Sequence, residues 1–213
     1  MSKMRYWLSV HLPLLPLESV RPRWCDPAPY VVVEKGKVIS VSREAYALGV
    51  RVGMRPGGVS AVAPSTVVLE RDLQREEITR NAIALALLQF TPEVAHAGDS
   101  SIVLDVTASL GLFRGRAAIG RRIRASTQAV GVTVRLGTGP TALGAWLLAR
   151  LPLSRRLALL RRTVKMASLE RQLDRIPCDY LPAAVPHLEW LAGIGATDLA
   201  ALRRLPAKVY SAG

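Results

Sequence analysis

The stretch HAGDSSIVLDVTASLGLF, residues 96–113, decides the fold. It predicts a strand, a turn and a second strand that leads into a helix. An enzyme built on such a sheet would gather acidic side chains at this place. Yet Ser100 and Ser101 precede the apolar run, and one carboxylate, Asp105, follows it. The stretch therefore contains either an active site or the remains of one.

Strands and helices alternate on both sides of this stretch. The β-branched runs around Lys35-Gly36-Lys37 predict a hairpin, and residues 71–89 predict a helix. A further helix is closed by Gly131, and VTVRLGTG follows it as a strand. The predicted order is β–α–ββ–α–β–α–ββ–α–β–α and then helices. Residues 93–150 hold a β-β-α-β-α series, which is part of a ferredoxin-like palm in an α+β fold.

The composition favours a polyanionic partner. The chain has 213 residues, half of them apolar, which allows one larger domain or two small ones with a buried core. Its 29 Lys and Arg residues exceed its 16 Asp and Glu residues, so the formal net charge is +13. Such an excess predicts binding to nucleic acid before membrane. The alternative is a basic protein from a proteome rich in Arg and Ala.

No apolar run is long enough to cross a bilayer, because charged residues interrupt every candidate. Residues 1–20 lack a small-residue cleavage site and are not a signal peptide. Cys25 and Cys178 stand far apart, without partners at metal-binding spacing. These features predict a cytoplasmic protein in a reducing compartment, with no zinc site and no membrane partner.

Along its whole length the chain resembles the Y-family translesion DNA polymerases. Four stretches carry the resemblance in the order and spacing of that family: VISVSREAYALGVRVGM (38–54), SSIVLDVTASLGLF (100–113), VRLGTGPTALGAWLLARL (134–151) and LEWLAGIGATDLAALRRLP (188–206). Three more are typical of its ImuB-type branch, the polymerase-like subunits of bacterial mutagenesis cassettes: HLPLLPLES (11–19), FTPEVA (90–95) and SLGLFRG (109–115).

The resemblance implies a division into subdomains. Residues 1–27 and 90–152 would form the palm, and residues 28–89 a small α/β fingers-like region whose last helix could be shared with the palm. Residues 153–213 would form part of a helical thumb. The little finger and the tail that generally holds the clamp-binding motif are expected to be absent.

The resemblance also locates the metal positions of active relatives. Aligning LESV with the first helix of the family places Ser9 at the first metal-binding Asp and His11 where a second acid often stands. Aligning Leu104-Asp105 places Ser100 and Ser101 at the catalytic Asp-Glu pair. Two-metal phosphoryl transfer needs Mg²⁺ ions held mainly by carboxylates. We therefore predict no catalytic residue, no metal ligand and no cofactor.

Asp99 lies close to these positions but is displaced by one residue. A shift of one residue along a strand turns the side chain to the other face of the sheet. Asp99 could rescue a metal site only through a β-bulge. An active polymerase with displaced acids, Asp99 and Asp105, stays an alternative.

Nucleotide-handling positions are altered in the same alignment. The fingers of the family carry a Tyr and an Arg that contact the triphosphate, and here Arg43 and Tyr46 stand there with the chemical types exchanged. Trp146 replaces a phosphate-binding Lys, and Leu14 replaces the aromatic residue that screens the sugar. Several losses in one pathway indicate a chain no longer selected for nucleotide addition.

The segment LAGIGATDLAALRRL resembles the helix-hairpin-helix of the family's thumb. Glycines in such a hairpin let backbone N–H groups approach a DNA phosphate, and nearby cations add contacts with the backbone. The predicted DNA-binding residues are Gly193, Ile194, Gly195, Arg203, Arg204 and Lys208. The alternative is a helical packing unit without a ligand.

Two other helical segments carry basic stripes. One includes Arg121, Arg122 and Arg124, and the other, over residues 155–165, includes five cations. Each stripe is either a solvated face or a track for the DNA backbone. LGTGP, which follows a strand and opens a helix, is either a tight turn or a weak phosphate-binding signal.

By resemblance, the chain is a non-catalytic, DNA-binding scaffold in DNA-damage-induced mutagenesis and translesion synthesis, within the SOS response. Its expected partners are primer-template DNA, a replicative-type polymerase subunit, a RecA-like accessory protein and the sliding clamp. Besides an active polymerase, the remaining alternative is a protein-interaction module without DNA contact.

Overall fold

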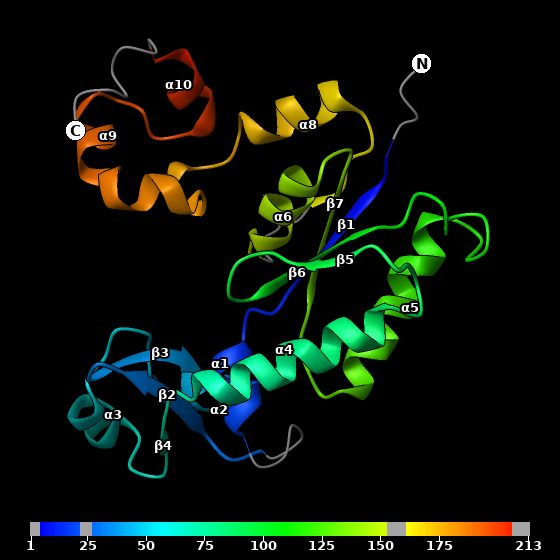
Figure 1. Cartoon of the computed structure of the whole chain (residues 1–213). Coiled ribbons are helices and arrows are strands. Elements are labelled where there is room, and N and C mark those ends of the chain that lie inside the picture. The colour runs from blue at the N-terminus through cyan, green and yellow to red at the C-terminus, as the bar shows by residue number, and fades with distance from the viewer. Residues whose placement is uncertain (1–4, 22–26, 153–160, 206–213) are drawn as a thin grey trace. The chain divides into compact units, whose positions relative to one another are not determined.

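A computed structural model of the chain describes residues 5–21, 27–152 and 161–205 (Figure 1). The chain divides into two compact units. The first is drawn from residues 1–11, 101–109 and 135–213, and the second from residues 12–100 and 110–134. The chain thus passes repeatedly between the two units. The assignment of palm, fingers and thumb to residue ranges stays a prediction.

The first unit is built on three antiparallel strands. β1 (Trp7–His11) lies between β6 (Ser101–Asp105) and β7 (Arg135–Gly139). Every residue of β6 is buried, as expected for an apolar strand covered on both faces. Helix α6 (Ala142–Arg150) packs against β7 and β1. The central strand of this sheet is therefore the one that carries Ser9 and His11.

Helices complete the first unit. The Thr141 side chain accepts a hydrogen bond of 3.1 Å from the Gly144 N–H and so caps the start of α6. Leu147, Leu148 and Leu151 pack with Leu169 and Ile176 in one apolar cluster. The helical elements that follow α6 are α8 (Met166–Leu173), η2 (Cys178–Tyr180), η3 (Pro182–His187), α9 (Leu188–Gly193) and α10 (Leu199–Arg204).

The second unit contains a sheet in the order β3-β2-β4. β2 (Tyr30–Glu34) and β3 (Lys37–Val41) form the predicted hairpin. Its turn places Lys35 and Gly36 at φ 50° and 71°, which is the backbone of a two-residue turn with two left-handed positions. β4 (Val67–Glu70) runs parallel to β2 at the edge. The apolar cluster behind this sheet includes Val31, Val33, Val38, Ala45, Val50 and Val59.

The remaining elements of the second unit are helices and one short strand. α4 packs against both α1 and α5, and Gly131, at φ 83°, follows α5 as predicted. The elements are α1 (Leu15–Val20), α2 (Arg43–Ala47), α3 (Pro56–Val62), α4 (Leu73–Leu87), β5 (Val94–His96) and α5 (Arg116–Ala129).

A partly buried ion cluster joins the sheet to the start of α4. Arg71 donates to both carboxylate oxygens of Glu76, from Nε at 2.7 Å and from Nη2 at 2.8 Å. Its Nη1 lies 3.2 Å from the Glu34 carboxylate on β2. The hydrogen bonds with Glu76 raise the pKa of the Arg71 guanidinium above its ordinary value. Glu76 is only 5% exposed, so this carboxylate depends on Arg71 for its charge balance.

Apart from α3, the predicted order of elements is the order that forms, and the α+β class is confirmed. One helix, α3, was not predicted, because Gly57 and Gly58 are poor helix formers. Pro56 starts this helix and Val59 is buried in the cluster behind the sheet, so packing decides there. No helix among the described residues is long and apolar enough to cross a membrane.

Candidate functional site

The positions matched to the family's metal site lie across from one another on β1 and β6. Ser9 is opposite Val103, and His11 is opposite Ser101. Directly opposed residues of antiparallel strands point to the same face of the sheet. The two strands therefore bring Ser9, His11 and Ser101 to one face, as the alignment requires.

These side chains include no carboxylate and are mostly buried. Ser9 and Ser101 are fully buried. The Ser101 hydroxyl lies 3.0 Å from Nδ1 of His11, within hydrogen-bonding distance. The hydroxyl of Ser9 has no hydrogen-bond partner among the described residues. The face thus presents two hydroxyls and an imidazole, and no carboxylate at these three positions.

Ser100 and Asp99 lie just before β6. The Ser100 carbonyl accepts a hydrogen bond of 2.8 Å from the Leu12 N–H. Asp99 is exposed, and its carbonyl accepts from Arg80 at 2.8 Å. The register of residues 7–11 with residues 101–105 contains no bulge. Asp99 lies outside this regular paired stretch, with its carbonyl bonded to Arg80.

Asp105 has a structural partner at the other end of β6. Its Oδ1 accepts hydrogen bonds from the N–H of Thr107, at 2.9 Å, and from the Thr107 hydroxyl. Its Oδ2 lies 3.8 Å from the guanidinium of Arg5. Asp105 lies four positions after Ser101, which is about 13 Å along a strand. Asp105 therefore closes the turn after β6 and does not share a site with Ser101.

The donors on β1 and β6 do not fit a pair of Mg²⁺ ions. Among residues 5–21, 27–152 and 161–205, His, Cys, Asp and Glu side chains form no group of three or more that could hold a metal ion. Mg²⁺ requires octahedral oxygen ligands, and a pair of such ions needs several anionic ones. Two buried hydroxyls and an imidazole supply no negative charge.

The positions matched to nucleotide binding are also altered. Arg43 begins α2, and Tyr46 on the same helix is 57% exposed. The guanidinium of Arg51 lies 3.9 Å from the centroid of the Tyr46 ring and donates to the Tyr46 carbonyl. On α6, the guanidinium of Arg150 lies 5.0 Å from the ring centroid of Trp146. Both aromatic rings therefore stack with cations of the chain itself.

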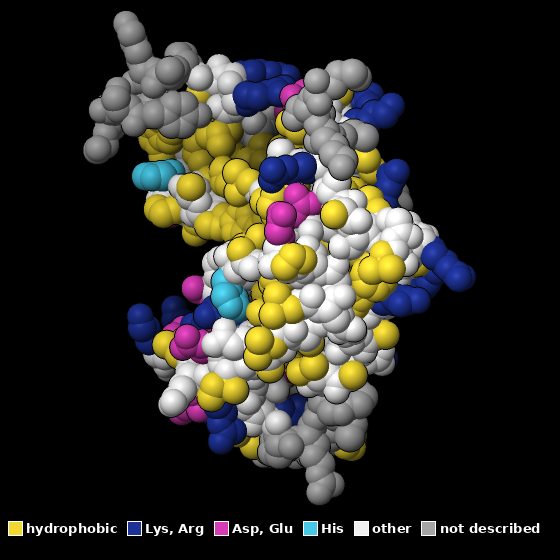
Figure 2. Space-filling view, turned by 45° about the vertical axis from the view of Figure 1, so that its right-hand side comes forward, with side chains coloured by type: hydrophobic (Ala, Val, Ile, Leu, Met, Phe, Trp, Pro, Cys, Tyr) yellow, Lys and Arg dark blue, Asp and Glu magenta, His cyan; other side chains and the backbone are white. Residues whose placement is uncertain are grey.

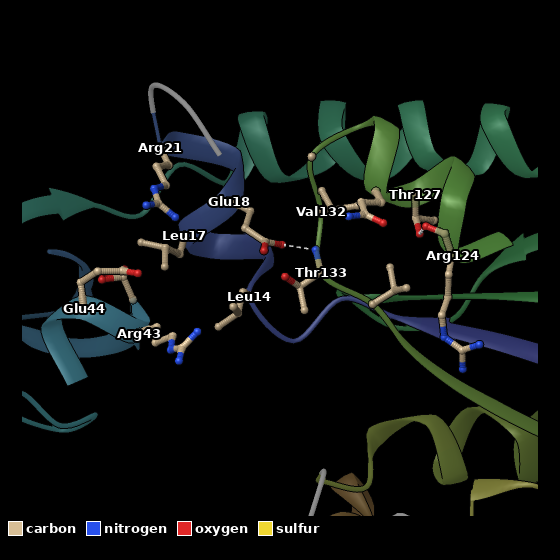
Figure 3. Close-up of a pocket in the computed structure, with 14 residues that line it drawn as sticks. Leu14, Leu17, Glu18, Arg21, Arg43, Glu44, Arg124, Thr127, Val132 and Thr133 are labelled. Atoms are coloured by element: carbon tan, nitrogen blue, oxygen red, sulfur yellow. Dashed lines mark hydrogen bonds between the residues drawn. The ribbon is translucent and has the colours of Figure 1, made fainter. Parts of the chain in front are cut away.

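A cavity of about 400 Å³ lies in the second unit, between α1, the start of α2 and the end of α5 (Figure 3). Leu14, at the position matched to the sugar-screening residue, forms part of its wall. Three guanidinium side chains, from Arg21, Arg43 and Arg124, and two carboxylates, from Glu18 and Glu44, also line it. The cavity wall thus combines apolar side chains with charges of both signs.

Glu18 lines this cavity, although the sequence did not single it out. Its carboxylate accepts a hydrogen bond of 2.9 Å from the Thr133 N–H, 115 positions away in the chain. Burial raises the pKa of Glu18, and this effect exceeds the opposing effects of the Thr133 hydrogen bonds and of Arg21. The only sequence signal is its position four residues after Leu14, on the side of α1 that carries Leu17.

We expect Glu18→Gln to stabilise the protein at neutral pH. Because burial raises the folded-state pKa of this carboxyl, the folded state binds its proton more tightly than the unfolded state does. Wild-type stability should therefore rise as the pH falls through the folded pKa toward 4.5, the ordinary value. The advantage of the variant should shrink over the same range. Urea unfolding at neutral and mildly acidic pH measures this, with the exposed Glu77→Gln as control. A pH-independent advantage would contradict it.

Gly137 explains the sequence LGTGP. It lies on β7 against the backbone of α6, where an added Cβ would come within 2.3 Å of the Ala145 carbonyl oxygen and the Ala149 nitrogen. Only glycine allows the helix this close to the strand. Close packing of α6 on β7 therefore accounts for this glycine without a phosphate.

The predicted helical hairpin is present as α9 and α10. Gly195 has φ 77°, the left-handed conformation that glycine favours. The N–H groups of Ile194, Gly195 and Ala196 donate to carbonyls of the preceding helix, at 3.2, 3.0 and 2.8 Å. Gly193, Ile194 and Gly195 are exposed. The amides of this turn are thus already bonded, which leaves charged side chains as the main donors for a phosphate.

The predicted cations of the hairpin have different surroundings. Arg203 forms an ion pair with Asp174, with Nη2 and Oδ2 3.0 Å apart, although its side chain stays 62% exposed. Arg204, the next residue of α10, is exposed. Lys208 lies outside the described residues. The assignment of these residues to DNA binding stays a prediction.

Solved structures with this fold define a class. The fold matches a ternary complex of Dbh with a TM-score of 0.66 and 21% identity, over 94% of this chain and 60% of that one. It matches a Y-family DNA polymerase chimera of Dbh and Dpo4 with a TM-score of 0.66 and 20% identity, over 94% and 61%. DinB from Sulfolobus solfataricus matches with a TM-score of 0.65 and 20% identity, over 94% and 60%. The fold is that of the Y-family DNA polymerases.

The sequence places the chain within a family. The profile of the impB/mucB/samB family matches residues 18–150, which is more than half of the chain, and the chain belongs to that family. Protein ImuB from Caulobacter vibrioides (strain NA1000 / CB15N) is 29% identical over 103 residues. This match covers 48% of the chain and 22% of that protein. The predicted resemblance to the Y-family and to its ImuB-type branch is confirmed.

Proposed function

We propose that this protein is a non-catalytic, polymerase-like scaffold that binds DNA during damage-induced mutagenesis and translesion synthesis. The observation that carries the proposal is the pairing of His11 with Ser101 beside the buried Ser9. These residues stand where the resemblance places carboxylates. A strand register that aligns the three positions but fills them with two hydroxyls and an imidazole supports a retained fold without metal-dependent chemistry.

The physical reason is charge. Phosphoryl transfer with two metal ions needs anionic oxygens to hold two divalent cations about 4 Å apart. Serine hydroxyls stay protonated and therefore supply no anionic oxygen. Asp105 could offer one carboxylate, but it is held by Thr107 at the far end of β6. Trp146, stacked with Arg150, adds an aromatic ring where the family uses a phosphate-binding Lys.

Primer extension tests the loss of catalysis. We expect no template-directed nucleotide incorporation above background with Mg²⁺ or Mn²⁺, beside an active Y-family polymerase as positive control. Incorporation that disappears in Asp99→Asn or Asp105→Asn would contradict the proposal and show an active polymerase with displaced ligands. Thr107→Val serves as the control for loss of the turn that Asp105 closes.

The proposed partner is primer-template DNA, bound through its backbone. Arg203 and Arg204 at the end of α10 are the described cations assigned to this contact, and Lys208 completes the set by sequence. The resemblance adds a replicative-type polymerase subunit, a RecA-like accessory protein and the sliding clamp, in the cytoplasm. The aligned relatives extend well beyond this chain, so these contacts are proposed for the assembly as a whole.

Arg203→Glu together with Arg204→Glu should weaken DNA binding irrespective of DNA sequence. Removing two phosphate contacts should lower the slope of log affinity against log salt by about 2 for duplex DNA. Fluorescence anisotropy over a salt series measures both quantities. Arg171→Glu, on α8, is the single-site control. Unchanged affinity and slope would remove the thumb from the DNA-binding surface, and negligible binding of the wild type at low salt would favour a protein-interaction module.

A further inference from the structure

The net charge of the chain is concentrated in one segment. Residues 106–169 contain twelve Arg and Lys residues and no Asp or Glu. The rest of the chain carries 17 cations and 16 acids and is nearly neutral. A generally basic proteome would spread its excess of cations along the chain, so this uneven distribution requires a local cause.

Helix α5 lies in this segment and turns one face to solvent. Ile119, Gly120, Ile123 and Thr127 are buried and hold the helix against the second unit. On the opposite side the exposed residues are Ala117, Arg121, Arg122, Ala125, Gln128 and Ala129. We call this exposed set, together with Arg114 just before the helix, the α5 face. The α5 face is basic and contains no large apolar side chain.

The cations of the α5 face are open to solvent. Arg121 forms no ion pair or hydrogen bond with any residue that the structure describes. The guanidinium of Arg122 lies 5.4 Å from the ring centroid of Phe113, and the residue is exposed. Arg114 is exposed, with φ 57°, in the turn before the helix.

The acidic residues of α4, the helix that packs beside α5, do not neutralise the α5 face. α4 packs beside α5 in the same unit, and Gln89 just after α4 donates to Ser126 on α5 at 3.2 Å. The acids of α4, Glu76 and Glu77, lie in its first turns, and Glu76 is bonded to Arg71. In Figure 2, Lys and Arg side chains protrude along the right-hand edge at the height of α5 in Figure 1, without Asp or Glu beside them on this side.

We propose that the α5 face is a second nucleic-acid-binding surface, which holds a phosphate backbone without reading base sequence. Guanidinium groups pair with phosphate in a bidentate way, and small alanines between them let the backbone approach. A protein partner would need an aromatic or large apolar anchor at the centre of its interface. Ala117, Ala125 and Ala129 provide none, so the chemistry favours a polyanion.

The spacing of these cations suits consecutive phosphates. Arg121 and Arg122 are adjacent in the chain and project on either side of Ala125, and Arg114 precedes the helix by two residues. The helix rises about 1.5 Å per residue, so the cations span on the order of 12 Å. Long guanidinium side chains over that span reach two or three phosphates. This surface belongs to the second unit, and the inference requires neither the thumb assignment nor the loss of catalysis.

The test replaces all three cations in the full chain, as Arg114→Gln, Arg121→Gln and Arg122→Gln. Affinity for fluorescein-labelled duplex and single-stranded DNA is measured by anisotropy over a salt series. We expect affinity at low salt to fall about 10- to 100-fold, and the salt slope to drop by about 3 for duplex and about 2 for single strands. The matched control removes three exposed cations outside the segment, as Lys35→Gln, Lys37→Gln and Arg75→Gln.

Each outcome has one meaning. An unchanged affinity, or an equal loss in the control, overturns the α5 face as a binding surface and leaves total charge as the cause. Loss of binding to polyglutamate with DNA binding intact would identify an acidic protein instead and also overturns it. The Arg203→Glu and Arg204→Glu variant is run in parallel. If only the Arg203→Glu and Arg204→Glu variant loses affinity for DNA, the α5 face is not a binding surface and the proposed function stands. If only the α5 variant loses affinity, the assignment of DNA binding to the thumb is wrong. Circular dichroism confirms that both variants are folded.

Discussion

Replacing Glu76 by alanine should lower the free energy of unfolding by about 3 to 4 kcal/mol, because it leaves a partly buried guanidinium without its main partner. Arg71 holds the Glu76 carboxylate through two hydrogen bonds of 2.7 and 2.8 Å and reaches Glu34 at 3.2 Å. The cluster joins the end of β4 to the start of α4 and to β2. Loss of Glu76 therefore affects three elements of the second unit at once. Urea unfolding followed by circular dichroism measures the change.

The exposed pair of Arg75 and Asp72 provides the matched control. It lies one turn away with side chains 62% and 41% exposed, and its ions are 3.3 Å apart. Surface pairs contribute between 0 and about 1 kcal/mol, so Arg75→Ala should change stability little. The double variant Arg71→Met with Glu76→Leu removes both charges together and should recover much of the loss. Equal effects of Glu76→Ala and Arg75→Ala would show that burial does not strengthen the Arg71 cluster.

Gly137→Ala should destabilise the first unit by about 3 kcal/mol. The added Cβ meets backbone atoms of α6 at 2.3 Å, and neither the helix nor the strand can move aside as a side chain would. The cost falls on the contact of α6 with the sheet that carries Ser9. Chemical denaturation of the purified variant measures the loss, and a reduced yield of folded protein would agree with it.

Gly58→Ala is the opposite case in the same chain. Gly58 lies inside α3, and nothing is within 4 Å of a Cβ added there. Alanine at such a helical position should stabilise the protein by about 0.5 to 1 kcal/mol. If Gly137→Ala were as harmless as Gly58→Ala, the close approach of α6 to β7 would be wrong.

Much of the order of elements could be predicted because its signals are local. The hairpin follows from two β-branched runs around Lys35-Gly36, and the ends of α2 and α5 follow from Gly49 and Gly131, both with positive φ. Such turn and cap residues act over a few positions, so a single sequence reveals them. The alternation of strands and helices then follows.

Burial was harder to predict because it depends on distant neighbours. Leu73 and Ile78 on α4 fit the same helical pattern as Ile83 and Leu87, yet only the latter two are buried. Trp190, an aromatic residue of a type that is mostly buried on average, is 48% exposed. A pattern shows which residues can share a face, but the elements packed on that face decide which are covered.

Some features of the candidate site could likewise be predicted from the sequence, and others could not. The alignment of Ser9, His11 and Ser101 predicted their meeting, since strand register follows from the order of buried residues. It did not predict the contact of His11 with Ser101 or the capture of Asp105 by Thr107. Glu18 and Thr133 are 115 residues apart, and no periodic pattern connects positions so distant. Side-chain partners of that kind emerge only from the folded chain.

The central strand β1 is synthesised long before the two strands that pair with it. Its residues 7–11 pair with residues 101–105 and 135–139, whereas the hairpin of β2 and β3 is complete at Val41. At 5–20 residues per second, a ribosome needs roughly 5 to 20 s to pass from Val41 to Gly139. During that interval the nascent N-terminal strand lacks at least one of its two partner strands, although Leu8 and Val10 are both fully covered in the finished protein. Chaperones that bind short apolar segments would therefore meet this strand first.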